Sequence, residues 1–420
     1  MKKSNQLLLL FTVFFLFLSS CSEKDILKST VVNFKSNIAI HYPPNYNPKA
    51  HSPSFAIINE PNELLNKSDS NKVNVIFSNI EDRELAQVII GENVDLYGTG
   101  EVMGDLIRNG KNLKLWNTDN YSYGKDHGQR LYQSHPWVLG VREDGTSFGV
   151  IADNTWKMEI SLGERISFFS EGPAFRVIVI EKESPQEVMK ELGNLTGTID
   201  LPPLWSLGFH QCRYSYYPDS RVKSIADTMR IKNIPCDVIW MDIDYMQDFR
   251  IFTFDSTNFP DPKETNDYLH KNNFKSVWMI DPGIKAEKGY FVFDSGDSLD
   301  AWVKTKNDTV FVGKVWPGDC VFPDFTQNKV TKWWGTLYKD FMRTGVDGVW
   351  NDMNEPAVFE TSDWTMGDSN RHKGGKDFPN DIHLRYHNVY GMMMVEASRN
   401  GIQKVNPKKR PFVLTRSNFL

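Results

Sequence analysis

Cysteine is scarce in this sequence, with four residues in 420. None lies in a CxxC pair or in a Cys/His spacing of the kind that holds zinc, so we predict no structural metal site. Cys212 and Cys236 lie near two predicted neighbouring strands and could form a disulfide in an oxidising compartment. With Cys21 assigned to another role below, an odd number remains, and we expect Cys212, Cys236 and Cys320 to be buried free thiols.

An excess of basic charge is also missing. The 48 lysines and arginines are outnumbered by 53 aspartates and glutamates, which gives a net charge of −5. The sequence has no basic tract that would neutralise a phosphate backbone, so we expect no nucleic-acid partner. Apolar residues make up 40% of the chain and aromatic residues 13%, which is enough for a large core and at least two domains.

The N-terminal hydrophobic run is well short of the roughly 20 residues that a membrane-spanning helix needs. Two lysines precede the apolar run Leu7 to Leu18, and small residues follow it, as in a secretory signal peptide. Leu18-Ser19-Ser20-Cys21 resembles the bacterial lipobox, in which the cysteine is acylated. We predict a lipoprotein signal peptide over residues 1–21 and attachment to a lipid bilayer through Cys21, on the periplasmic or outer-membrane face of a bacterial cell envelope. The alternative is a plain secretory signal with an incidental cysteine.

Short strand-like runs fill the region from residue 36 to about 200. Before it, residues 22–35 are polar and predicted to be a tether. The runs are bounded by turn residues, and they are Val73 to Phe77, Gln87 to Ile90, Trp137 to Val141, Ser147 to Ala152 and Phe175 to Ile180. A short helix is expected over Ser184 to Leu195, and Pro202-Pro203 marks a boundary. We predict an antiparallel β-sandwich for this region.

From residue 201 to 420, apolar strands alternate with amphipathic helical stretches, which predicts a parallel sheet covered by helices. The strands are Leu207 to Cys212, Asp237 to Asp242, Ser276 to Asp281, Gly348 to Asp352 and Pro411 to Thr415. The helices between them are Arg221 to Lys232, Asp261 to Asn272, Val330 to Arg343 and Asp381 to Arg399. A doubly wound sheet has the same alternation, but no Gly-rich fingerprint follows the first strand. We therefore predict a (β/α)8 TIM barrel that is incomplete, with about five strands present.

Acidic residues recur at the ends of three predicted strands. Asp242 and Asp244 follow one strand, Asp281 the next, and Asp352 and Glu355 the fourth. Each acid alone is explained as well by a cap or an ion pair, but their recurrence in phase with the strands indicates the catalytic end of a barrel. Carboxylates gathered there suit glycoside hydrolysis, which passes through a positively charged, oxocarbenium-like state.

The segment Trp350-Asn351-Asp352-Met353-Asn354-Glu355-Pro356 resembles the signature of glycoside hydrolase family 31. Further blocks that resemble the family occur in the family's order, and the similarity extends from about residue 95 to the last residue. These blocks are Pro203-Leu204-Trp205 through Arg213-Tyr214, Ile239 through Met246, Lys314-Val315-Trp316-Pro317-Gly318 and Arg410-Pro411-Phe412 through Arg416-Ser417.

The resemblance implies a role for several positions. Asp352 corresponds to the nucleophile that forms a covalent glycosyl-enzyme. Asp242 corresponds to the carboxylate that binds sugar hydroxyls in the −1 subsite. Arg416 corresponds to an arginine that keeps the nucleophile ionised and oriented. Asp119 corresponds to an acid on a sandwich loop that reaches the mouth of the barrel.

The other substrate-binding positions that the resemblance implies are apolar or aromatic: Tyr214, Met279, Trp316, Trp350 and Met353. Tyr214 stands where many relatives have tryptophan, and ordinary apolar packing explains it equally well. Asp244, Asp281 and Glu355 are expected to support their neighbours rather than to act in the reaction.

The resemblance therefore implies a retaining, exo-acting α-glucosidase that removes terminal α-linked glucose from oligosaccharides, without a metal or an organic cofactor. In the family the acid/base aspartate lies on a later strand. We expect these 420 residues to be an N-terminal fragment, inactive because that residue lies beyond Leu420. Alternatives are an α-xylosidase, a transglucosidase, or a lipoprotein that binds glycans without catalysis.

Acylation of Cys21 predicts that cells expressing the protein with labelled palmitate incorporate the label into it. The Cys21→Ala variant should lose the label, because the acylated thiol is absent. Fluorography of the immunoprecipitated protein measures this, and label that persists in the variant would contradict the lipoprotein assignment.

Overall fold

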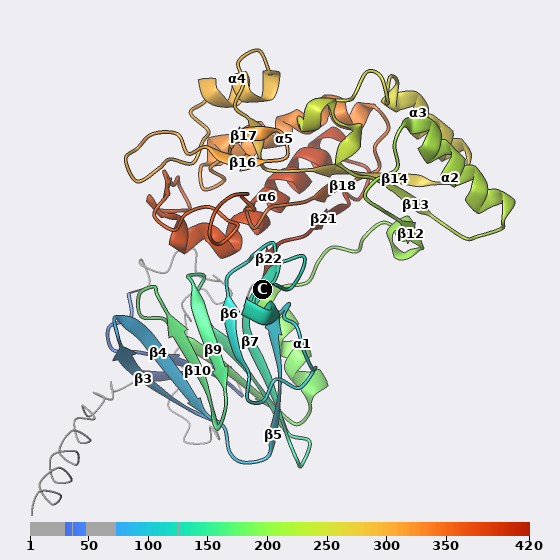
Figure 1. Cartoon of the computed structure of the whole chain (residues 1–420). Helices are drawn as coiled ribbons and strands as arrows, with labels where there is room; N and C mark the ends of the chain where they lie inside the picture. Colours follow the sequence, from blue (N-terminus) through green and yellow to red (C-terminus); the bar gives the residue numbers. More distant parts are fainter. Residues whose placement is uncertain (1–29, 36, 48–72, 125) are drawn as a thin grey trace, which may run out of the picture.

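The computed structural model describes residues 30–35, 37–47, 73–124 and 126–420, which form a β-sandwich beneath an α/β domain (Figure 1). The predicted signal peptide, Cys21 and residues 22–29 of the predicted tether lie outside these residues. The rest of the tether prediction is wrong. β1 (Thr30–Lys35) pairs antiparallel with β2 (Ile38–Tyr42), because this segment carries the β-branched and aromatic residues that favour strands.

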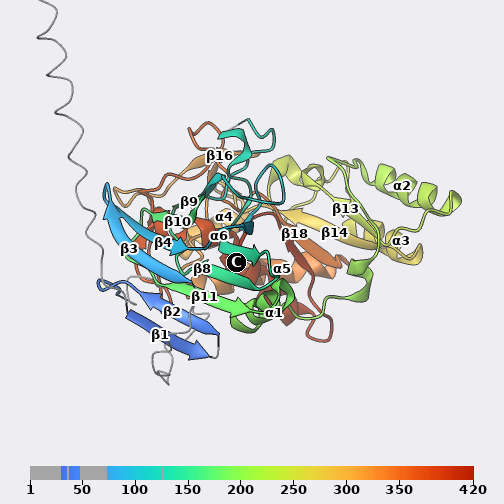
Figure 2. The ribbon, with the colours of Figure 1, turned by 90° about the horizontal axis from the view of Figure 1, so that it is seen from below.

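Two sheets make up the sandwich. In the first sheet, β1, β2, β11, β8 and β7 lie side by side, β5 pairs with β7, and Figure 2 shows β1, β2, β11 and β8 in this order. The bounds of its further strands are Val94–Gly100 (β5), Gln133–Arg142 (β7), Ser147–Ala152 (β8) and Val177–Lys182 (β11). The second sheet has the order β3-β4-β10-β9-β6, with bounds Asn74–Ile80, Arg83–Ile89, Arg165–Ser170, Met158–Leu162 and Asn112–Leu115.

Alternation along the strands builds the sandwich core. Val75, Phe77, Ala86 and Val88 point inward from the second sheet and are buried against Val150 and other residues of the first, as expected when one face of each sheet is apolar. On the other face of the first sheet lies α1 (Pro185–Thr196). The predicted β-sandwich is confirmed.

The α/β domain is organised around a parallel sheet with the order β12-β13-β14-β18-β21. The strands are His210–Gln211, Val238–Met241, Lys275–Ile280, Gly348–Asn351 and Val413–Thr415. All five predicted strands are present, although the first is shorter than predicted because Leu204–Leu207 forms a 3-10 turn (η3). The five parallel strands bear out the predicted incomplete barrel.

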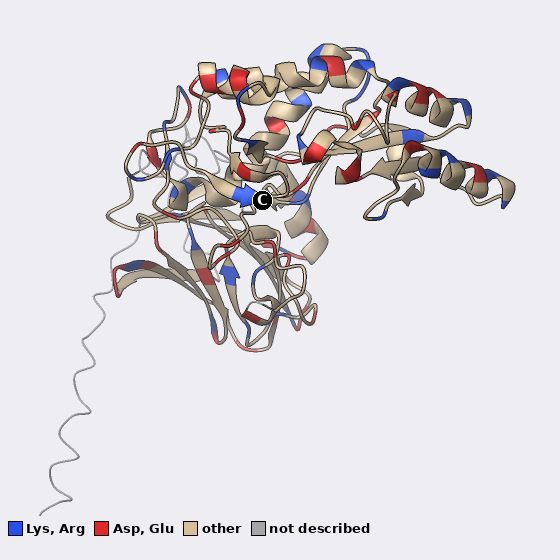
Figure 3. Ribbon diagram, turned by 45° about the horizontal axis from the view of Figure 1, so that its top comes forward, with Lys and Arg blue, Asp and Glu red and all other residues tan. Residues whose placement is uncertain are grey.

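Helices flank this sheet, and their bounds are Asp219–Ile231 (α2), Pro262–Lys271 (α3), Phe291–Ser298 (α4), Asn328–Arg343 (α5) and His383–Val405 (α6). Figure 3 shows acidic and basic residues interspersed along α2 and α3, and Lys223 on α2 pairs with Glu264 on α3. Two small sheets interrupt the alternation. One joins β15 (Ile284–Lys285), β16 (Gly313–Val315) and β17 (Gly318–Val321), and the other joins β19 (Arg371–His372) to β20 (Asp381–Ile382).

The junction between the domains lies along α6 (Figure 1), and side-chain hydrogen bonds cross it. Asn388 on α6 donates to the carbonyls of Leu115 and Thr155 in the sandwich, over 3.1 and 3.3 Å. The last strand, β22 (Asn418–Phe419), pairs in parallel with β7 of the sandwich. The chain after β21 is thereby held against the first domain.

Three cysteines lie among the described residues, and all three are free thiols. Cys236 and Cys320 are buried, as predicted. Cys212 is exposed, contrary to prediction, because β12 ends one residue before it and the chain leaves the sheet there. No helix of the described residues is long and apolar enough to cross a membrane.

Gly401 on α6 and Gly335 on α5 mark the closest approach of these two helices. A Cβ atom at position 401 would lie 2.5 Å from the Cα and the carbonyl oxygen of Gly335. We expect Gly401→Ala to lower the free energy of unfolding by about 1–3 kcal/mol, because the backbones must separate. Gly193 on α1 is the control, since its Cβ would meet only a methyl group 3.8 Å away.

For Gly193→Ala we expect no loss, and up to about 1 kcal/mol of gain from helix propensity. Urea unfolding followed by circular dichroism compares the two variants. Equal stability of the two would contradict the close helix contact.

Candidate active site

Four charged residues follow four neighbouring strands directly. Asp242 follows β13, Asp281 follows β14, Asp352 follows β18 and Arg416 follows β21. The strands are parallel and adjacent, so their carboxyl ends bring these side chains to one edge of the sheet. The backbone ladder continues to this edge, because the amide of Asp352 donates to Ile280 and that of Arg416 to Asn351, both over 3.1 Å.

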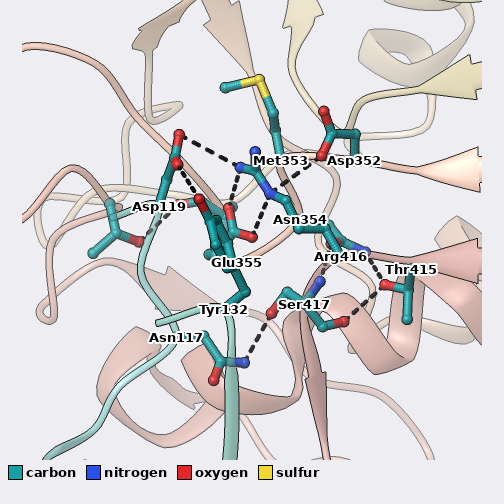
Figure 4. Close-up of polar contacts among 12 residues, drawn as sticks. Asn117, Asp119, Tyr132, Asp352, Met353, Asn354, Glu355, Thr415, Arg416 and Ser417 are labelled. Atoms are coloured by element: carbon teal, nitrogen blue, oxygen red, sulfur yellow. Dashed lines mark hydrogen bonds and ion pairs between the residues drawn. The ribbon is translucent and has the colours of Figure 1, made fainter. Parts of the chain in front are cut away.

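Arg416 lies at the centre of the cluster (Figure 4). Its Nε and Nη2 atoms donate to the two carboxylate oxygens of Glu355 over 2.9 and 2.7 Å. Nε also lies 3.2 Å from Oδ1 of Asp352, and Nη2 lies 3.6 Å from Oδ2 of Asp119. A planar guanidinium can engage several carboxylates at once from a fixed position, so Arg416 joins three acids that come from two domains.

Tyr132 is part of the site, and sequence reasoning missed it. Its hydroxyl donates to Oδ1 of Asp119 over 3.2 Å, and the guanidinium of Arg416 stands 4.9 Å from the centre of its ring. The tyrosine therefore holds Asp119 and also covers one face of the guanidinium. In the structure it lies one residue before β7, and nothing in the sequence pattern around it points to the distant Arg416.

Burial dominates the electrostatics of Asp352. Burial raises its pKa, while Arg416 and the backbone amide of Met353 lower it and the nearby Asp242 and Asp119 raise it again. Met353 has a left-handed backbone, with φ of 50°, and this turn lies directly after the carboxylate. The adjacent cation favours the ionised form of Asp352, as a nucleophile requires.

Asp281 is a buried acid, with 4% of its surface exposed. Burial raises its pKa well above the ordinary value, and the charge of Asp352 raises it further. Its Oδ1 atom is buried, with no hydrogen-bond partner among the described residues. Two neighbouring carboxylates cannot both ionise readily. Burial and the charge of Asp352 favour the protonated form of Asp281, while Arg416 opposes the burial that raises the pKa of Asp352.

Burial also raises the pKa values of Asp242 and Glu355. Asp242 accepts a hydrogen bond from the amide of Ile243 over 2.7 Å. Asp244, which we predicted to be a support, accepts from the hydroxyl of Ser215, next to Tyr214. The arrangement fits the supporting roles expected of Asp244 and Glu355, since their oxygens are engaged by neighbouring groups.

Aromatic side chains lie beside the charged cluster. Trp316 donates its indole N–H to the sulfur of Met353 over 2.9 Å, and its ring centre lies 6.2 Å from that of Tyr214. Both rings are substantially exposed, at 42% and 60%, so they are free to contact a sugar. Trp350 packs against Trp240 from the neighbouring part of the parallel sheet, with ring centres 5.8 Å apart.

Met279 is fully buried, and its carbonyl accepts from Tyr245. The roles of Met279, Trp316, Trp350, Met353 and Tyr214 in binding a sugar stay predictions, as do those of Asp119, Asp242, Asp352 and Arg416.

Carboxylates gathered at the carboxyl edge of a barrel sheet define a site suited to glycoside hydrolysis. Comparison with known families supports this class. Residues 199–420 match the TIM-barrel domain of glycosyl hydrolases family 31, and residues 86–160 match the N-terminal galactose mutarotase-like domain of glycosyl hydrolase 31. The chain belongs to glycosyl hydrolase family 31.

Curated relatives and solved structures agree with this family. The chain is 40% identical over 326 residues to alpha-glucosidase 2 of Bacillus thermoamyloliquefaciens. The matched region covers 77% of this chain and 41% of that protein. It is 33% identical to mouse neutral alpha-glucosidase AB, over 74% of this chain and 35% of that protein. The chain thus spans less than half the length of these relatives.

Among solved structures, a family 31 alpha-glucosidase from Bacteroides thetaiotaomicron is 56% identical, with a TM-score of 0.70 over 79% of this chain and 54% of that chain. A family 31 dextranase from Flavobacterium johnsoniae, complexed with isomaltotriose, is 25% identical, with a TM-score of 0.82 over 95% of this chain and 53% of that chain.

The raised pKa of Asp281 predicts a pH-dependent stability effect. Because the folded pKa lies above the unfolded value of about 3.9, folding favours the protonated acid, and stability is lost as pH rises from about 4 towards the folded pKa. Asp281→Asn removes this titration. We expect it to raise the free energy of unfolding at pH 7 by roughly 1–3 kcal/mol and to have little effect at pH 4.

Urea unfolding at the two pH values measures this difference. An Asp281→Asn variant that is less stable than the parent at pH 7 would show that the acid is ionised in the folded protein.

Proposed function

We propose that this protein is a retaining α-glucosidase that releases terminal α-linked glucose through a covalent intermediate on Asp352. The observation that carries the proposal is the position of Asp352, a buried carboxylate at a strand end within 3.2 Å of the guanidinium of Arg416. Ion pairing keeps a carboxylate ionised in a site where burial opposes ionisation, and a nucleophile must be ionised to attack.

The reaction has two displacements. An oxygen of Asp352 bonds to the anomeric carbon while the bond from that carbon to the leaving oxygen breaks, and an acid gives the leaving oxygen a proton. A water molecule then attacks the anomeric carbon of the glycosyl-enzyme, gives a proton to the same group, and frees Asp352. Two inversions give net retention.

The proton donor has to be a second carboxyl about 5 Å from the nucleophile. Among the described residues, three of the acids around Asp352 are engaged elsewhere. Glu355 is held by both arms of Arg416, Asp119 by Tyr132, and Asp242 by its own backbone turn. The fourth, Asp281, has a buried oxygen with no partner among the described residues, but it precedes Asp352 in the chain, whereas the family's acid/base aspartate lies on a later strand. We propose that the acid/base residue is not among these 420 residues and that the chain alone does not turn over unactivated substrates.

The substrate assignment rests on similarity. The relatives of highest identity reported above are named alpha-glucosidases, and exposed Trp316 and Tyr214 offer flat faces that suit stacking on a sugar ring. We propose α-glucoside oligosaccharides as substrates. Attachment to the bacterial cell envelope through acylated Cys21 is the accompanying proposal for where the enzyme acts.

The test compares the Asp352→Asn variant with the parent. Both proteins are expressed from the gene's own reading frame, including whatever it encodes after residue 420. We expect kcat for maltose to fall at least about a thousandfold in the variant, because the amide cannot form the ester intermediate. Asp340→Asn is the control, since the Asp340 side chain is 88% exposed on α5 and should leave kcat unchanged.

The 420-residue chain is assayed in parallel with maltose. We expect no turnover. Asp352→Asn activity close to that of the parent would contradict the nucleophile assignment, and turnover by the 420-residue chain would contradict only the placement of the proton donor.

A further inference from the structure

Four buried side chains form an unbroken line of hydrogen bonds from the barrel domain to the sandwich. Oδ1 of Asp324 lies 2.9 Å from Nδ1 of His372, and Nε2 of His372 lies 3.0 Å from Nδ1 of His383. Nε2 of His383 lies 2.9 Å from Nδ1 of His387, whose Nε2 lies 2.7 Å from the carbonyl oxygen of Asn117. All four side chains belong to residues with 0% exposure. We call Asp324, His372, His383 and His387 the histidine relay.

Three separate elements supply the relay. Asp324 lies in the turn after β17, and His372 is the second residue of β19. His383 and His387 are one turn apart at the start of α6, so that they face the same side of the helix. The ring of His387 also stacks on Trp116, with centres 3.7 Å apart, which holds the last imidazole in the orientation that its hydrogen bond needs.

The two ends of the relay fix where protons must be. A carbonyl oxygen only accepts, so Nε2 of His387 carries a proton. At the other end, Asp324 accepts from the amide and hydroxyl of Thr326, from the side-chain amide of Gln327 and from the amide of Lys373, over 2.5–3.2 Å. An acid that receives this many donors is a carboxylate, so Nδ1 of His372 carries a proton as well.

A count of protons then gives the charge carried by the three histidine rings. Each of the four hydrogen bonds needs one proton between its two atoms, and neither end group supplies any. A neutral imidazole has one N–H, so three neutral rings supply three protons. The fourth hydrogen bond requires one ring to be an imidazolium with protons on both nitrogens.

We propose that the three histidines of the relay hold one excess proton, as an imidazolium paired with the Asp324 carboxylate, and that the relay positions the Asn117–Asp119 segment at the candidate active site. His372 is the charged ring, because it contacts the carboxylate. Burial lowers the pKa of His387 to about 3 and holds that of His383 well below its usual range, which leaves these two rings neutral.

Other charged groups around the relay do not replace Asp324 as its counter-ion. Lys157, Arg130 and Asp363 act on His387 from a distance. Tyr386 and Tyr390 flank His372, with ring centres 5.2 and 6.4 Å away, but their hydroxyls donate to backbone carbonyls of Pro379 and Pro323. The charge with which the three histidines make a hydrogen bond is therefore that of Asp324.

The relay ends at a residue that joins both halves of the site. Asn117 donates its side-chain amide to Ser417 over 2.8 Å and to the carbonyl of Asn388 over 3.1 Å (Figure 4 shows the bond to Ser417). It lies two residues before Asp119, and Ser417 directly follows Arg416. The hydrogen bond from His387 thus fixes the backbone from which Asp119 reaches Arg416. The consequence for catalysis rests on the proposed function, and the proton count does not.

The first measurement reads the protonation state directly. Nitrogen NMR of the 420-residue chain with ¹⁵N-labelled histidine distinguishes a neutral ring from an imidazolium. About two pH units above the ordinary histidine pKa of about 6.5, we expect one imidazolium to persist. His41 is the internal control: it is buried, neither ring nitrogen has a hydrogen-bond partner among the described residues, and burial lowers its pKa to about 4, so it should be neutral.

Asp324→Asn should remove the imidazolium, because an asparagine amide donates to His372 and three neutral rings then complete the line. A parent spectrum in which every histidine is neutral at that pH would overturn the proposed charge, whether or not the variant folds.

The second measurement tests positioning. In His387→Leu the bond to Asn117 is lost, and we expect amide hydrogen exchange in residues 115–120 to accelerate about tenfold, with β7 and β8 unchanged. His387→Gln keeps a donor for the Asn117 carbonyl and should restore slow exchange. Unchanged exchange in the leucine variant would overturn the positioning role. Neither readout uses turnover, so a failure of the proposed function leaves both results interpretable.

Discussion

Everything at the candidate site depends on one guanidinium. Asp352, Glu355 and Asp119 are buried acids that would repel one another, and each lies within 3.6 Å of Arg416. Removing either a buried cation or its partner leaves an uncompensated charge, which is costly. The arginine is held in turn by a bidentate bond to Glu355 and by the ring of Tyr132. The site is therefore one electrostatic unit, in which burial favours the protonated form of Asp281 and the cation favours the ionised form of Asp352.

That unit spans two domains, so the fold has to hold them in register. Parallel strands deliver Asp352 and Arg416 to the same edge of the sheet, but Asp119 arrives from the sandwich. The polar junction along α6, with Asn388 and Asn117 at its centre, fixes this third contribution. The histidine relay ends at the same junction, and a buried ion pair at its far end would make that geometry specific rather than merely stable.

Much of this was predictable from periodicity and motifs. Apolar strands alternating with amphipathic helices predicted the parallel sheet, and acids in phase with the strand ends predicted where Asp242, Asp281 and Asp352 gather. Tyr132 and the relay were not predictable, because His372 and His387 come from separate elements and carry no common spacing. The strand β1 was missed because residues 22–35 as a whole read as a polar linker, and the partner that makes Thr30–Lys35 a strand is β2. The exposure of Cys212 depends on where β12 ends.

In the proposed mechanism, Asp352 forms a bond to the anomeric carbon of a glucosyl unit. The most direct measurement is to treat the extended protein with a fluorinated α-glucosyl fluoride, which slows hydrolysis of the intermediate, and to map the labelled peptide by mass spectrometry. We expect a single fluoroglucosyl adduct on the peptide that contains Asp352, with the added mass on that carboxylate. An adduct on Asp242, Asp281 or any other residue would contradict it.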